Sequence, residues 1–267
     1  MFGYEMVLVH GAFEGPWVFR SFAAAFASDG WAVRSVTLPG HEPGGDLRGL
    51  GLRQMAAAVE AALLEPERTV LVGHSLGGWL VLKVLERLEV AASVLLMPLP
   101  PRGLSREARR RVWRAASLRA RLAFLFGETV SLEGEEGLLD LAFGPGGEAR
   151  KRFLREGGME GGRLLRQIAR LGLAGPFGLL SERRLARRQR GRPHLVVASR
   201  DDLLTPAVDL EETARLLAAT LLVLEGLPHN ALATEASALL ASRTALWLDH
   251  ALAGPKFRDG LVLPSMK

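Results

Sequence analysis

Apolar residues in the first hundred positions fall into two kinds of run that alternate along the chain. Short continuous apolar runs have the length expected of buried strands and lie at 6–10, 31–38, 69–73 and 90–97. Stretches with apolar positions at helical spacing, or rich in alanine, lie between and before them at 19–28, 50–64 and 76–88. Such alternation predicts βαβ units, and therefore a parallel sheet with helices on its faces.

The alternation stops near residue 101 and resumes at residue 194. Residues 101–192 contain no run that predicts a strand, and their Arg, Leu, Gly and Glu content is typical of several short helices separated by glycine. After this segment, strands are expected at 194–199 and 221–224, and helices at 206–219 and 231–252.

These patterns predict a single α/β core with one long insertion. We expect residues 1–100 and 193–253 to form the core, residues 101–192 to form a helical cap, and residues 254–267 to be a loose tail. An insertion of this length within one sheet is usually functional, so the cap is expected to act as a lid over the site.

Composition narrows the functional classes. The chain has no cysteine, which excludes disulfides, thiolate metal sites and a cysteine nucleophile. Residues 1–10 lack the basic and apolar segments of a signal peptide, and no uncharged apolar run approaches the roughly 18 residues of a membrane span. We therefore expect a cytoplasmic protein. One Asn and three Gln in 267 residues are typical of a thermophile, although codon bias in a GC-rich genome gives the same pattern.

The segment Gly73-His74-Ser75-Leu76-Gly77 matches the nucleophile-elbow pattern G-x-S-x-G. It lies between a predicted strand and a predicted helix, as the pattern requires. Two glycines leave room for neighbouring chain around a strained serine, and the N-terminus of the following helix favours negative charge. A glycine-rich turn without a catalytic role can have the same local sequence. The predicted strand before the motif and the predicted helix after it favour a nucleophile elbow. We predict Ser75 as a nucleophile, with the backbone N–H of Leu76 beside it.

The end of the first strand supplies a second element, His10-Gly11-Ala12. Acyl transfer needs two hydrogen-bond donors aimed at the developing oxyanion. One is expected from Leu76 and the other from the backbone N–H of Ala12, because Gly11 permits a close approach. We expect His10 itself to be structural, since it comes too early in the chain to be the usual triad base.

A serine nucleophile also needs a general base and an acid that orients the base. Asp201 and Asp202 follow the strand at 194–199, and His229 follows the strand at 221–224. Open α/β sheets place their sites at this carboxyl edge, and the order Ser, Asp, His is the order of an α/β hydrolase. One of the two aspartates is expected to serve only in the entry to the next helix.

The remaining histidines have no predicted chemical role. His74 lies inside the elbow and is expected to pack beneath it, His41 lies in a loop where it can line the pocket, and His194 and His250 are expected to be structural. No spacing of histidines and carboxylates indicates a metal site, and no motif indicates a cofactor.

Three segments resemble a known family. VLVHGAFEGPW at 7–17, VGHSLGG and DDLLTP are similar to the methylesterase and hydroxynitrile-lyase group of the α/β-hydrolase superfamily. The resemblance covers most of the chain outside the insertion and the tail. It implies the α/β-hydrolase fold, with a mainly parallel central sheet and flanking helices. It also implies that Asp202, four residues before Pro206, is the triad acid. Lyases of this group have Thr and Lys where this chain has Gly11 and Asn230, which disfavours a lyase.

These elements together predict a serine hydrolase that cleaves a small-molecule carboxylic ester or thioester through an acyl-enzyme on Ser75. An acyltransferase, a C–C hydrolase and a cofactor-free peroxidase-like enzyme would use the same machinery. A ligand-binding protein that keeps the triad but turns over slowly is a further alternative.

The distribution of charge adds a prediction about substrate. Residues 101–192 contain 20 Arg and one Lys against 10 acidic residues, a net of +11, whereas the rest of the chain has 13 basic against 19 acidic residues, a net of −6. A basic lid attracts substrates with an anionic part. Solvated helix faces, a subunit contact or an acidic membrane surface would use the same charges. The net charge of the whole chain is +5, and no motif combines basic and aromatic residues, so the sequence does not indicate binding to nucleic acid.

Overall fold

The central feature of the molecule is a six-stranded sheet in which every strand pairing is parallel. The structure, a computed structural model, describes residues 3–145, 147–171 and 180–253, so the predicted tail lies outside the described residues. The strand order is β2-β1-β3-β4-β7-β8. The strands are β1 (Glu5–Val9), β2 (Ala32–Val36), β3 (Thr69–His74), β4 (Ala92–Leu96), β7 (His194–Ser199) and β8 (Thr220–Leu224). The predicted α/β fold is confirmed.

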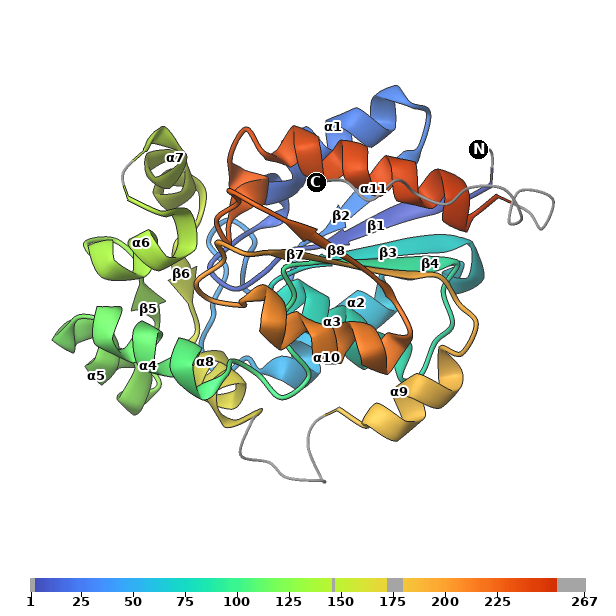
Figure 1. Ribbon diagram of the computed structural model, residues 1–267. Helices are drawn as coiled ribbons and strands as arrows, with labels where there is room; N and C mark the ends of the chain where they lie inside the picture. Colours follow the sequence, from blue (N-terminus) through green and yellow to red (C-terminus); the bar gives the residue numbers. More distant parts are fainter. Residues whose placement is uncertain (1–2, 146, 172–179, 254–267) are drawn as a thin grey trace.

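Helices cover both faces of this sheet (Figure 1). On one face, α1 (Arg20–Ser28) packs against α11 (Ser237–Ala251). The other face carries α2 (Leu52–Ala61), α3 (Leu76–Leu85) and α10 (Ala207–Leu217). Because the sheet is buried on both sides, its central strands are continuous apolar runs and not alternating ones.

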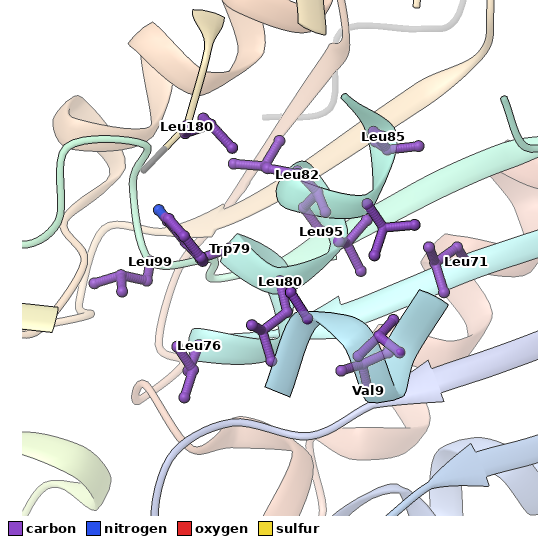
Figure 2. Close-up of a cluster of buried hydrophobic side chains, with 14 of the residues drawn as sticks. Val9, Leu71, Leu76, Trp79, Leu80, Leu82, Leu85, Leu95, Leu99 and Leu180 are labelled. Atoms are coloured by element: carbon purple, nitrogen blue, oxygen red, sulfur yellow. The ribbon is translucent and has the colours of Figure 1, made fainter. Parts of the chain in front are cut away.

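Alternate residues of each strand enter two separate hydrophobic clusters. Met6 and Leu8 of β1 pack with α1 and α11, whereas Val7 and Val9 pack with α2, α3 and α10. Figure 2 shows the second cluster, to which α3 contributes Leu80 and also Leu82, which lies beside Leu180. These contacts fix α3 on the sheet, and with it the loop that precedes α3.

Most of the inserted segment lies beyond the carboxyl ends of the strands (Figure 1). It forms α4 (Arg106–Ala115), α5 (Leu118–Phe126), α6 (Glu136–Phe143), α7 (Glu148–Glu156) and α8 (Gly162–Arg170). The side chains of Ser105 and Ser117 accept hydrogen bonds from backbone N–H groups in the first turns of α4 and α5, which explains where these helices begin. By contrast, α9 (Glu182–Arg188) packs against α3 and α10 on the core.

Two details of the prediction are wrong. The insertion does contain strands, because β5 (Val130–Ser131) and β6 (Met159–Glu160) pair antiparallel. Each has two residues, which is too short to show an alternating pattern. The last helix begins at Ser237 and not at Ala231, because the Thr234 hydroxyl donates to the Ala231 carbonyl and accepts from the Ala236 N–H. These local bonds compete with helix formation.

In the part of the chain that the structure describes, no helix combines the length and the apolar character that a membrane crossing requires.

Truncation of Leu80 tests the importance of the α3 contact. Leu80 is fully buried, so Leu80→Ala is expected to lower the free energy of unfolding by about 2–5 kcal/mol. Leu64 is 79% exposed, so Leu64→Ala is expected to change the free energy of unfolding by no more than about 0.5 kcal/mol. Urea unfolding followed by circular dichroism measures both. Equal midpoints for the two variants would contradict this description of the core.

Candidate active site

Three polar side chains from separate loops meet at the carboxyl edge of the sheet. Ser75 follows β3, Asp202 follows β7 and His229 follows β8. The Ser75 Oγ lies 2.8 Å from His229 Nε2, and His229 Nδ1 lies 2.7 Å from Asp202 Oδ2. The structure therefore brings together the three side chains predicted for a triad, in a continuous hydrogen-bonded chain.

The backbone at Ser75 is strained. Its φ of 52° and ψ of −120° place it outside the regions that a side chain ordinarily allows. A Cβ at Gly73 would lie 2.5 Å from the Gly77 carbonyl oxygen, and a Cβ at Gly77 would collide with the backbone oxygens of Val9 and His10. Both glycines of the motif are thus required by close backbone contacts, as the sequence predicts.

Asp202 is held by several donors. Its Oδ1 accepts the backbone N–H groups of Leu204 and Thr205, and its Oδ2 accepts the Thr205 hydroxyl at 2.8 Å. Burial raises the pKa of Asp202, but the nearby His229 and the hydrogen bonds from Thr205 outweigh burial, so the pKa lies below its ordinary value. The carboxylate is therefore ionised at neutral pH, deep in the protein.

Asp201 points elsewhere. Its Oδ2 accepts the Gly226 N–H at 2.6 Å in an exposed position. The geometry thus favours Asp202 over Asp201 as the partner of His229. Thr205 was not predicted to contribute, although it lies within the segment DDLLTP. The only feature of the sequence that indicates this role of Thr205 is a hydroxyl side chain three residues after Asp202.

The hydrogen bonds also assign the tautomer of His229. An ionised carboxylate only accepts, so the Nδ1 that contacts Asp202 carries the proton. The Nε2 is then free to accept the hydroxyl proton of Ser75. This is the tautomer that a general base needs.

The two residues predicted to supply the oxyanion donors, Leu76 and Ala12, line the same cavity as Ser75. Leu76 is the first residue of α3, so its N–H has no acceptor within the helix. Ala12 follows β1 and lines the same cavity as Ser75. A Cβ at Gly11 would lie 2.9 Å from the Ser75 Cβ, which shows how closely the two loops approach.

A cavity of about 460 Å³ opens onto Ser75 and His229. Its walls are largely apolar, and many come from the inserted segment, including Trp113, Phe124 and Ile168. The basic side chains that line it are Arg109 and Arg121. The guanidinium of Arg121 stacks on the Trp113 ring, 5.3 Å from its centre. A pocket of this size and polarity suits a small, mostly apolar molecule.

Two histidines near the site have structural contacts. His10 Nε2 accepts the Leu38 N–H at 3.2 Å and its Nδ1 donates to the Gly11 carbonyl at 2.9 Å. Burial lowers the pKa of His10 to about 4, so its ring is neutral. His41 does not line the cavity as predicted, because its Nε2 lies 3.2 Å from the buried carboxylate of Glu160 on β6.

Within the described ranges, no group of three or more histidine, cysteine, aspartate or glutamate side chains is arranged to hold a metal ion.

Solved structures with a similar fold include esterases and hydrolases. A pyrethroid hydrolase from Sphingobium faniae JZ-2 superposes with a TM-score of 0.61 and 19% identity, over 95% of this chain and 98% of that one. A methylesterase from Arabidopsis superposes with a TM-score of 0.63 and 16% identity, over 92% and 99% of the two chains. At such identities the similarity concerns the fold.

Sequence comparison gives a nearer relative over a shorter length. A carbendazim-hydrolysing esterase from Nocardioides sp. (strain SG-4G) is 35% identical over 90 residues, which are 32% of this chain and 36% of that esterase. The match thus spans about a third of the curated relative. A family model, described as the alpha/beta hydrolase family, matches residues 6–243. The matched range includes nearly all of the sheet, the elbow motif and the three side chains predicted to form a triad, and the chain belongs to the alpha/beta hydrolase family.

Proposed function

We propose that this protein hydrolyses a carboxylic ester or thioester of a small, largely apolar molecule through an acyl-enzyme on Ser75. The observation that carries the proposal is the hydrogen-bonded chain from Ser75 Oγ through His229 to Asp202, at 2.8 Å and 2.7 Å. This chain opens onto an apolar cavity. The arrangement has the roles and the order of an acyl-transfer triad.

Acylation begins at the serine hydroxyl. His229 Nε2 takes the proton as Ser75 Oγ attacks the substrate carbonyl carbon, and Asp202 stabilises the imidazolium that forms. The negative charge that develops on the carbonyl oxygen is accepted by the backbone N–H groups of Leu76 and Ala12. The strained turn places Ser75 at the N-terminus of α3. The positive end of the helix dipole therefore adds to the stabilisation of the negatively charged substrate oxygen.

Collapse of the tetrahedral intermediate releases the alcohol or thiol. His229 returns its proton to the leaving group, and the acyl group remains on Ser75 as an ester. Water then enters, gives a proton to His229 and attacks the acyl carbonyl. As the bond between the acyl carbon and Ser75 Oγ breaks, His229 returns that proton to Oγ, which regenerates the serine hydroxyl and releases the acid. An alcohol or amine acceptor in place of water would make the same site an acyltransferase.

Both the cavity and the relatives support an apolar ester substrate. Trp113, Phe124 and Ile168 offer apolar walls for the acyl or alcohol part of the substrate. The relatives are named for hydrolysis of carbendazim and pyrethroids, or as a methylesterase. We also propose that residues 101–171 act as the cap and that α9 belongs to the core, since α9 packs on α3 and α10.

Removal of the nucleophile tests the central step. Ser75→Ala is expected to lower kcat for a p-nitrophenyl ester on the order of a million-fold, because no covalent intermediate forms. A fluorophosphonate probe is expected to label the wild-type protein once, at Ser75, and to leave the variant unlabelled. Turnover of the variant within tenfold of wild type would contradict the mechanism. If the wild type released one equivalent of p-nitrophenol in a burst and then did not turn over, the alternative of a ligand-binding protein with slow turnover would be favoured.

The two neighbouring aspartates provide a matched pair. Asp202→Asn is expected to lower kcat by roughly 10⁴, because the amide no longer holds the tautomer of His229 that accepts the serine proton. Asp201→Asn removes an exposed carboxylate that bonds Gly226 and is expected to change kcat by less than threefold, roughly the scale of a surface substitution. Steady-state kinetics compare the two variants. The reverse ranking would assign the acid role to Asp201.

The charge of the insertion predicts a preference for anionic esters. Many of its arginines are paired with carboxylates, but Arg109 faces the cavity. At low salt, kcat/KM is expected to be higher for an ester with an added carboxylate than for a matched neutral ester. The difference should disappear near 1 M salt, where the screening length is about 3 Å. Arg109→Gln should reduce this preference, whereas Arg110→Gln, outside the cavity, should not. No preference at low salt would contradict the predicted role of Arg109 but not the proposed hydrolysis of an apolar ester.

A further inference from the structure

Beneath the nucleophile elbow lies a buried pair of titratable side chains that the proposed reaction does not use. His74, directly before Ser75, is fully buried, and Glu14, in the loop after β1, is 3% exposed. His74 Nδ1 lies 3.0 Å from Glu14 Oε2. Buried ionisable groups are costly unless paired, so a pair at this position needs an explanation.

Each member of the pair has a second hydrogen bond to the backbone of a different active-site loop. Glu14 Oε2 accepts the Gly11 N–H at 2.6 Å, and Gly11 directly precedes Ala12. His74 Nε2 lies 3.0 Å from the backbone oxygen of His229. A continuous chain of hydrogen bonds thus runs from the oxyanion loop, under Ser75, to the loop of the general base.

The protons along this chain are fixed by its acceptors. A backbone carbonyl only accepts, so His74 Nε2 donates to His229. Burial lowers the pKa of His74, but the charge of Glu14 outweighs burial and the pKa lies above its ordinary value. Burial likewise raises the pKa of Glu14, but His74 outweighs it and the pKa lies below its ordinary value. An ionised Glu14 carboxylate only accepts, so His74 donates from both nitrogens, to Glu14 and to the His229 carbonyl.

We propose that Glu14 and His74 are positioning residues that hold the Ala12 N–H and the His229 ring in register with Ser75. The inference rests on the proposed function, because it assigns the pair a purpose in acyl transfer. Gly11 approaches the Ser75 side chain so closely that a small shift of its loop changes the oxyanion geometry. Displacements of about 1 Å at a reacting centre can cost about a hundredfold in rate.

The pair is not arranged for maximal stability. Glu14 Oε1 is buried and has no hydrogen-bond partner among the described residues. A buried ion pair is often less stable than apolar residues of the same volume. The bonds that the pair does form go to the backbones of the two loops that carry proposed catalytic groups. This selective bonding favours a role in geometry over a role in folding.

The test is a series of substitutions at Glu14. Glu14→Ala is expected to lower kcat for a p-nitrophenyl ester about a hundredfold, comparable to the loss of one oxyanion donor, with KM within about threefold of wild type. Binding of a trifluoromethyl ketone, which mimics the tetrahedral intermediate, should weaken in proportion to kcat/KM. Rates are normalised to active sites counted with a fluorophosphonate. A folded Glu14→Ala variant with wild-type kcat would overturn the proposal.

Conservative variants keep the test valid if Glu14→Ala does not fold. A glutamine can accept the Gly11 N–H and donate to a neutral His74 Nδ1, so Glu14→Gln should retain most of kcat. Glu14→Asp keeps the charge, but its shorter side chain does not reach both partners, so its kcat should be well below that of Glu14→Gln. The opposite order would show that only the charge matters and would overturn the positioning role.

A matched control separates positioning from stability. Glu86 is also buried, at the opposite end of α3, where it accepts from Lys83 and from the Ser181 N–H. Glu86→Ala is expected to lower the melting temperature without a change in kcat per active site. If the wild type cleaves the ester and Ser75→Ala does not, the proposed function stands. The kinetics of the Glu14 variants then test only the positioning role.

Discussion

The contact between the end of β1 and the first turn of α3 is the constraint on which the active site depends. The backbone of β1 lies so close to Gly77 that no side chain fits there, and the same approach brings the loop after β1 against Ser75. Buried side chains of α3 pack in the same hydrophobic cluster as residues of the sheet and support this contact (Figure 2). Packing in the core therefore sets the distance between the proposed nucleophile, Ser75, and the proposed oxyanion donors.

The rest of the site follows from the parallel sheet. Each neighbouring strand ends at the same edge, so Asp202 and His229, far apart in the chain, reach Ser75 from the loops after β7 and β8. The strain at Ser75 is maintained by these surroundings and not by the turn itself. A rigid scaffold of this kind lets the reacting groups lie on loops without losing their geometry.

The sequence predicted the parts that depend on local pattern. Continuous apolar runs indicated the central strands, and the motif around Ser75 indicated the elbow because two glycines are needed there for steric reasons. The choice of Asp202 came from a family resemblance, and the structure supplies the reason: its neighbour bonds Gly226 at the surface. Local pattern could not predict β5 and β6, which pair across the insertion over two residues each.

Contacts between distant segments could not be predicted from the sequence either. Glu14 is a single charged residue in an apolar segment, and its partner His74 is 60 positions away, so no spacing links them. The same holds for His41 and Glu160, which meet only because β6 folds back over the loop after β2. Such pairs become visible when the three-dimensional arrangement is known, since each side chain alone has an ordinary structural explanation.

The origins of the cavity walls have a consequence for how such a protein diversifies. The side chains proposed to react follow strands of the central sheet, whereas Trp113, Phe124 and Ile168 come from the inserted segment. Mutations in the insertion can therefore change which molecules enter without disturbing the reacting groups. Glu160 sets a limit to this freedom, because its carboxylate also accepts the N–H of Phe13, next to Ala12. Lineages that exchange or remodel the insertion must preserve that attachment, or compensate for its loss, to keep the loop after β1 in place beside Ser75.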